Sequence, residues 1–144
     1  MNGFLSEGIK LVRLSNAAAA GTTTITGTAA RAGFNRCFIF AALGDVTDTS
    51  VLTLTGKSGN ESDASDAVAI SGAVATFTAG ASDADNKELA VDVALNDDDY
   101  VTVTLARGTA NAVVNGIFAI FYDSRIMPQL NSDLLAAVGR GVAL

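Results

Sequence analysis

Hydrophobic and polar residues alternate with a period of two over much of this 144-residue chain. The clearest case is residues 101–105, where Val101, Val103 and Leu105 alternate with two threonines. Successive side chains of a β-strand point to opposite faces, so this pattern gives a strand one dry face and one wet face. Threonine suits the wet face because β-branched side chains fit a pleated surface. The alternation therefore predicts a chain built from β-strands.

Turn residues separate the predicted strands at intervals of about ten residues. Glycine with polar neighbours occupies residues 56–60, and asparagine with three aspartates occupies residues 96–99. Ser71 and Gly72, between two apolar runs, predict a tight hairpin. Eight or nine short strands in a chain of this length fit an antiparallel, jelly-roll-like double sheet. We expect strands at residues 9–14, 22–28, 34–42, 52–55, 67–70, 73–78, 89–95, 101–105 and 112–122.

The predicted fold class is therefore all-β, an antiparallel β-sandwich with a short C-terminal helix or arm. Residues 1–16 form an N-terminal arm with a possible first strand, and residues 17–125 form the sandwich domain. Residues 126–144 form the C-terminal arm. Ser132 or Asn131 can cap a short helix there and Gly139 can end it. A helix this short is marginal unless its apolar side docks on something.

Two of the predicted strands are apolar on both faces, at residues 37–42 and 113–121. One interpretation is a pair of central strands, covered on one side by the second sheet and on the other by a loop. The other interpretation is that the outer face of these strands meets another subunit, because such a patch is unusual on a monomer. The sequence leaves both open.

The composition argues against an enzyme. Histidine is absent, which removes the usual near-neutral acid and base and every site built on imidazole. The single cysteine, Cys37, lies in an apolar run and is expected to be a buried, unreactive thiol. Nine basic and fifteen acidic residues give a net charge of −6, which lacks the basic surface of a nucleic-acid binder. No run approaches the roughly 18 apolar residues of a membrane span. We therefore expect no catalytic residues and no cofactor.

Acidic residues cluster in the predicted loops, and the best candidate pair for a metal is Asp83 and Asp85, followed by Asn86. Hard cations such as Ca²⁺ take six to eight oxygen ligands, which aspartate-rich loops can supply. The segment lacks the spaced glycine and the distal glutamate of an EF-hand loop. Solvated loops that keep an apolar chain soluble are the simpler interpretation. We expect no metal site, with Asp83 and Asp85 as weak candidates.

The layout resembles the small β-rich virion proteins encoded among the head genes of tailed bacteriophages, the decoration or capsid-stabilising proteins. The resemblance covers roughly residues 17–128 and is compositional. Its carriers are an alanine- and threonine-rich opening, an aromatic strand, two threonine-rich strands, a glycine-spaced apolar strand and an Arg-x-x-Pro close, at residues 20–28, 34–43, 50–55, 99–105, 111–122 and 125–128. The acidic residues 97–99 and the helix-like tail depart from the family pattern.

The resemblance implies a jelly-roll-like, non-enzymatic protein that is made in the host cytoplasm and binds the major capsid protein on the capsid surface. It also implies a homo-oligomer, with a trimer favoured, and no contact with nucleic acid or membrane. A tail or head-fibre component and a Ca²⁺-dependent glycan-binding sandwich are the alternatives. The residues expected to contact other subunits or the capsid are apolar side chains near the two ends: Phe4, Leu5, Ile126, Met127, Pro128, Leu134, Leu135 and Val138.

Overall fold

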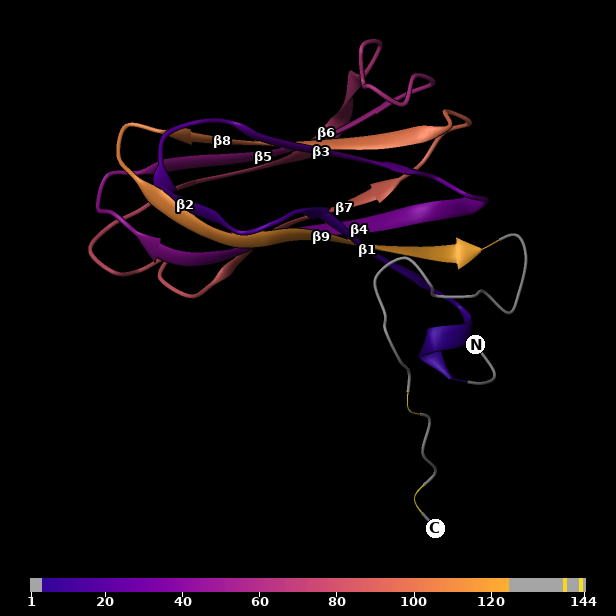
Figure 1. The fold of residues 1–144 in the computed structure, drawn as a ribbon, viewed down its shortest axis with the longest axis horizontal. Coiled ribbons are helices and arrows are strands. Elements are labelled where there is room, and N and C mark those ends of the chain that lie inside the picture. The colour runs from indigo at the N-terminus through magenta and orange to yellow at the C-terminus, as the bar shows by residue number, and fades with distance from the viewer. Residues whose placement is uncertain (1–3, 125–138, 140–142, 144) are drawn as a thin grey trace.

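The computed structural model describes residues 4–124, 139 and 143. Over this part of the chain the protein is two antiparallel sheets packed face to face (Figure 1). A single 3-10 turn, η1 (Leu5–Glu7), precedes the strands. The strands are β1 (Lys10–Ser15), β2 (Ala18–Gly21), β3 (Ile25–Ala30), β4 (Phe34–Val46), β5 (Val51–Gly59), β6 (Val68–Thr78), β7 (Glu88–Ala94), β8 (Tyr100–Gly108) and β9 (Ala112–Ser124).

The strand order is that of a jelly roll. The five-stranded sheet has the order β1-β9-β4-β7, with β2 also paired to β9, and the four-stranded sheet has the order β3-β8-β5-β6. Because β1 and β2 pair with successive parts of β9, they act together as one interrupted strand. The chain thus crosses between the sheets in the manner of eight strands folded as two Greek keys. The predicted all-β, jelly-roll-like sandwich is confirmed. No helix among the described residues is long and apolar enough to cross a membrane.

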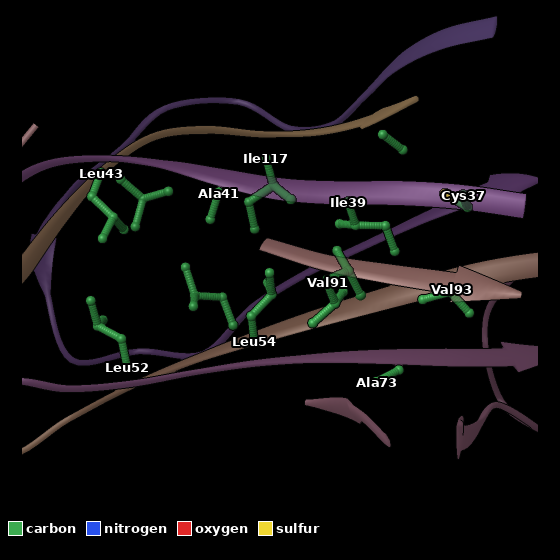
Figure 2. Close-up of a cluster of buried hydrophobic side chains, with 14 of the residues drawn as sticks. Cys37, Ile39, Ala41, Leu43, Leu52, Leu54, Ala73, Val91, Val93 and Ile117 are labelled. Atoms are coloured by element: carbon green, nitrogen blue, oxygen red, sulfur yellow. The ribbon is translucent and has the colours of Figure 1, made fainter. Parts of the chain in front are cut away.

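The core lies between the two sheets, as the alternation predicts (Figure 2). Leu52 and Leu54 of β5 are fully buried, and so are Val103 and Leu105 of β8. Each such side chain contributes about 1.5–3 kcal/mol relative to full exposure. The rings of Phe34 and Phe121 meet at one end of the core with their centroids 5.9 Å apart. Burial of alternate side chains on both sheets therefore holds the sandwich together.

The tight hairpin predicted at Ser71 and Gly72 is wrong. Residues 68–69 and residues 74–78 both pair with β5, so they belong to one strand, β6. The residues between them bulge out of the ladder, and Gly72 adopts the positive φ of +82° that suits such a distortion. Glycine beside serine signals a turn in either structure, and the local pattern does not distinguish a hairpin from a bulge.

The expected first strand is present as β1, paired with β9 inside the five-stranded sheet. The strand expected at residues 22–28 begins later, at Ile25, because residues 22–24 form the connection from β2. The short helix expected in residues 126–144 falls outside the described residues.

Candidate interaction surface

The two strands predicted to be apolar on both sides, β4 and β9, lie side by side in the middle of the five-stranded sheet. Their inward residues fill the core, and the residues between these face outward. Residues paired across antiparallel strands share a face, so the outward residues of neighbouring strands form one surface. We call this surface the aromatic face. Its members are Leu11, Arg13, Arg36, Phe38, Phe40, Ala90, Asp92, Phe118, Ile120 and Tyr122.

Three phenylalanine rings form the centre of the aromatic face. Phe40 of β4 stacks on Phe118 of β9, with centroids 5.5 Å apart and planes 28° apart. Phe38 lies beside Phe40 at 6.0 Å. All three side chains are only half-buried. Such ring pairs add about 0.5–1.5 kcal/mol beyond the area they bury, yet the outer side of the cluster remains in contact with water.

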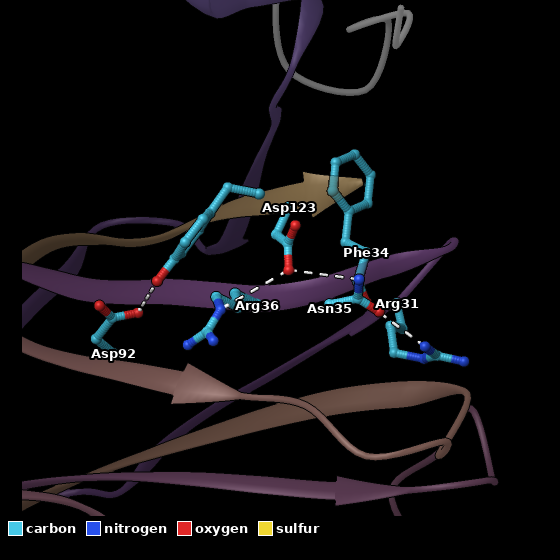
Figure 3. Close-up of polar contacts among 7 residues, drawn as sticks. Arg31, Phe34, Asn35, Arg36, Asp92 and Asp123 are labelled. Carbon is cyan, nitrogen blue, oxygen red and sulfur yellow. Dashed lines mark hydrogen bonds and ion pairs between the residues drawn. The ribbon is translucent and has the colours of Figure 1, made fainter. Parts of the chain in front are cut away.

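Charged residues border the rings. Arg13 of β1 places its guanidinium carbon 5.7 Å from the centroid of the Phe118 ring, a cation–π contact. At the other side of the sheet, the Tyr122 hydroxyl donates a 2.7 Å hydrogen bond to the carboxylate of Asp92 on β7 (Figure 3). This bond raises the pKa of Tyr122 above its usual value, with burial and the charge of Asp92 acting in the same direction. An aromatic centre with arginine in its border is the composition enriched at protein–protein interfaces.

Arg36 and Asp123 lie at the end of the aromatic face where β9 ends (Figure 3). Their side chains approach to 3.8 Å and are 53% and 55% exposed. An exposed pair of this kind contributes about 0–1 kcal/mol to stability. The pair is therefore available to a partner at little cost to the fold.

An open groove of about 800 Å³ continues from this end of the aromatic face. It runs from Ile120 and Tyr122 to Leu5 and Ile9, which precede β1. Leu5 is 59% exposed and Phe4 is 38% exposed. These two predicted contact residues thus lie at the groove, or next to it in the chain, and extend the apolar surface beyond the sheet. The other six, Ile126, Met127, Pro128, Leu134, Leu135 and Val138, lie outside the described residues.

The outer face of the four-stranded sheet is chemically different. Thr28 on β3 and Thr102 on β8 hydrogen-bond through their hydroxyls at 3.0 Å, and Thr76 on β6 donates to Thr53 on β5 at 3.4 Å. These threonines share bonds with one another across the strands; Thr102 is buried and Thr76 is exposed. The sandwich therefore has one hydroxylated outer face and one aromatic one. Of these two, the aromatic face has the composition of a protein contact.

The two weak metal candidates each fix a loop. The Asp83 carboxylate accepts a 2.8 Å hydrogen bond from the backbone N–H of Gly80, and the Asp85 carboxylate accepts one of 2.8 Å from Val46. Within residues 4–124 we find no group of three or more His, Cys, Asp or Glu side chains placed to hold a metal ion. Both carboxylates act locally on the backbone.

Cys37 lies on the inward side of β4 and is fully buried. Burial raises the pKa of the thiol from its usual 9.0 to about 12, and the negative charge of Asp92 adds to the effect. The thiol therefore stays protonated near neutral pH.

Sequence reasoning missed the charged border of the aromatic face. Arg13 is far from Phe118 in the sequence, and Asp92 is distant from Tyr122. The antiparallel register brings each pair together, and no local pattern reveals that register. The only available signal was the double-sided apolar pattern of residues 37–42 and 113–121.

No protein-family model and no curated protein matches this chain.

Proposed function

We propose that this chain is a non-enzymatic structural protein of a tailed-phage virion, a capsid decoration protein that binds the major capsid protein on the capsid surface. The observation that supports it is the aromatic face, an apolar and arginine-bordered surface on a rigid jelly-roll sandwich. Such a surface serves association between copies of the chain on the shell, since burying it against a neighbouring copy removes aromatic area from water. The resemblance of the sequence to decoration proteins is the reason for proposing a phage capsid as the particle to which the protein binds.

A protein that covers a shell works through many equivalent contacts. Each contact can be weak, because a multivalent assembly on a symmetric surface gains avidity. A closed homo-oligomer also covers apolar faces that a lone subunit exposes, and the resemblance favours a trimer. The net charge of −6 limits adhesion to packaged nucleic acid.

We assign attachment to the capsid to the two ends of the chain. Leu5 lines the groove beside the aromatic face, and Phe4 adjoins it in the sequence. Six further apolar candidates follow β9 in the sequence. This division leaves the aromatic face for contacts between subunits and the ends for contacts with the shell.

The test is co-sedimentation of the purified protein with assembled heads that lack it. We expect the full chain to pellet with heads, and deletion of residues 1–5 or 127–144 to lower the bound amount while the melting temperature of the sandwich is retained. A matched control is Val74→Thr, which removes a 51% exposed apolar side chain on β6, away from both ends; it should bind as the full chain does.

Equal binding by the full chain and both deletions would count against the assignment to the ends. Absence of any binding to heads would overturn the decoration role. Binding to tails or fibres instead would favour the tail or head-fibre alternative. A melting temperature that rises with Ca²⁺ would favour the glycan-binding module.

A further inference from the structure

The register of the five-stranded sheet places the aromatic face in rows that run across the strands. In the order β1, β9, β4 and β7, the first row is Arg13, Phe118, Phe40 and Ala90. In the same order, the next row is Leu11, Ile120, Phe38 and Asp92. The centre of both rows is apolar. The β1 side carries an arginine in the first row, and the β7 side carries an acid in the next row. The surface is thus asymmetric in charge across the strands.

We propose that the aromatic face is the interface between two copies of this chain. The copies are related by a two-fold axis that lies in the interface, parallel to the strands and above the line between β9 and β4. The inference deepens the proposed function by naming the partner of the aromatic face. It rests on that function, which gives the reason for copies of the chain to associate. A two-fold axis makes the same patch meet itself. Here β1 of one copy lies over β7 of the other, and β9 lies over β4.

Charge complementarity selects this arrangement. The axis places Arg13 of one copy over Ala90 of the other, a small side chain that leaves room for a guanidinium. Glu88 and Asp92 flank Ala90 on the same face of β7, and both are exposed. Each arginine therefore lies between two carboxylates of the other copy, and the operation creates this contact twice. Opposite charges at the border of an interface fix its register.

The other in-plane two-fold axis, across the strands, is unfavourable. It stacks β1 on β1 and β7 on β7, so Arg13 approaches the Arg13 of the second copy. Asp92 likewise approaches Asp92 at the opposite edge. Juxtaposed like charges at an interface cost several kcal/mol. The apolar centre packs against itself about either axis, so the charged border determines which of the two axes is favoured.

The size of the face sets the strength of the contact. Four strands and three rows cover about 19 Å by 20 Å, on the order of 400 Å² of flat area. A standard interface buries about 800 Å² of accessible surface on each partner. The contact is therefore small unless the groove residues add to it, and we expect a dimer that dissociates on dilution. A two-fold contact also yields a dimer in place of the trimer that the resemblance favours.

The test is a charge exchange between two variants. Variant one is Arg13→Glu, and variant two combines Glu88→Lys with Asp92→Lys. Each variant alone opposes like charges across the axis, so we expect its dimer dissociation constant to rise by about tenfold or more. In an equimolar mixture the new glutamate meets the new lysines, and the native arginine meets the native acids. We expect the mixture to form a mixed dimer to within about threefold of the original affinity.

Sedimentation velocity over a range of concentrations measures the mass, and native mass spectrometry identifies the mixed dimer. Matched controls carry the same charge changes elsewhere: Lys57→Glu on the outer face of β5, and Glu61→Lys with Asp48→Lys in exposed loops. These should dimerise as the unmodified chain does. Restored association on mixing also shows that both variants are folded.

Three outcomes would overturn the inference. They are a chain that stays monomeric at every concentration, a trimer, and a mixture that associates no better than its components. Retained binding to heads in any of these cases would leave the decoration role standing. Loss of head binding by a chain that still dimerises would instead overturn the decoration role alone.

Discussion

Arg107 is the residue that closes one end of the sandwich. Its side chain points inward from β8, is 5% exposed and contacts the connection between β2 and β3. The guanidinium donates to the backbone oxygens of Thr23, Ala19 and Ala112 at 2.7–2.8 Å, and to the Thr23 hydroxyl at 2.8 Å. A buried charge is tolerable when its hydrogen bonds are made. The Arg107 side chain therefore supplies the hydrogen bonds that a regular strand ladder would make where the chain passes from one sheet to the other.

We expect Arg107→Met to lower the free energy of unfolding by about 3 kcal/mol, because it leaves the buried Ala112 oxygen and the partly buried bonds to Ala19 and Thr23 without a donor. The stability of Arg107→Lys should lie between those of Arg107→Met and the unmodified chain, since a single ammonium cannot reach the same set of oxygens. Urea unfolding followed by circular dichroism measures both. The control is Arg36→Met, at a 53% exposed side chain, which should change stability by less than about 0.5 kcal/mol. Equal stability of the Arg107→Met variant and the unmodified protein would show that the bonds are not needed.

At the scale of elements, Gly27 lets β3 approach β1 of the other sheet. A Cβ atom at this position would overlap the backbone oxygen and carbon of Leu14. The contact joins the edges of the two sheets, and a backbone neighbour cannot move aside as a flexible side chain does. Gly27 is buried, so an added methyl group cannot avoid the overlap by moving into solvent. The glycine is therefore required for the two sheets to meet at this edge.

We expect Gly27→Ala to destabilise the fold by about 2 kcal/mol, in the range that overpacking costs. Gly108→Ala on β8 is the matched control, because its added Cβ would lie 3.7 Å from the nearest atom, the Val51 oxygen. The control should be neutral or slightly stabilising, since alanine restricts the unfolded chain more than glycine does. Thermal melts of the two variants give the comparison. A Gly27→Ala chain as stable as the Gly108→Ala chain would contradict the close approach.

The strands themselves were predictable from the sequence, and their partners were not. The alternation at residues 101–105 located β8 correctly, since it depends only on neighbours along the chain. The same reasoning took Ser71 and Gly72 for a hairpin, although β6 continues through them along β5. Which strands pair, and which strands lie at the edges of a sheet, depend on residues that are far apart in the sequence. Gly27 gave no signal because its neighbour across the sheets is Leu14, a residue of another strand.

At the scale of the whole molecule, the two outer faces explain what the sequence left open. Residues 37–42 and 113–121 were apolar on both sides, and a covering loop or another subunit were equal possibilities. The structure gives these strands adjacent places in one sheet and leaves Phe38, Phe40 and Phe118 only partly buried. At one end of this face, Leu5 of η1 lines the adjoining groove. The border charges needed the register as well, which is why composition alone did not locate the surface.

The core at the centre of the molecule also makes global stability depend on pH. The Cys37 thiol has its pKa raised from 9.0 to about 12 by burial, and to a lesser extent by the charge of Asp92. In the unfolded chain the thiol loses its proton near pH 9.0. Between these values the unfolded state binds fewer protons than the folded state. The free energy of unfolding is therefore unaffected by this group below pH 9.0 and falls as pH rises toward about 12.

We expect this term to remove about 2 kcal/mol of stability at about pH 10.5, from 1.36 kcal/mol per pH unit above the unfolded pKa. Cys37→Ala separates it from the other groups that titrate in this range, because they are common to both chains. The variant should be less stable at about pH 8, where it loses packing, and should lose about 2 kcal/mol less between there and about pH 10.5. Urea unfolding at both pH values, with a reductant present, measures the difference. Parallel losses in the two chains would mean that the thiol reaches water in the folded state, and that the core is looser around β4 than its full burial indicates.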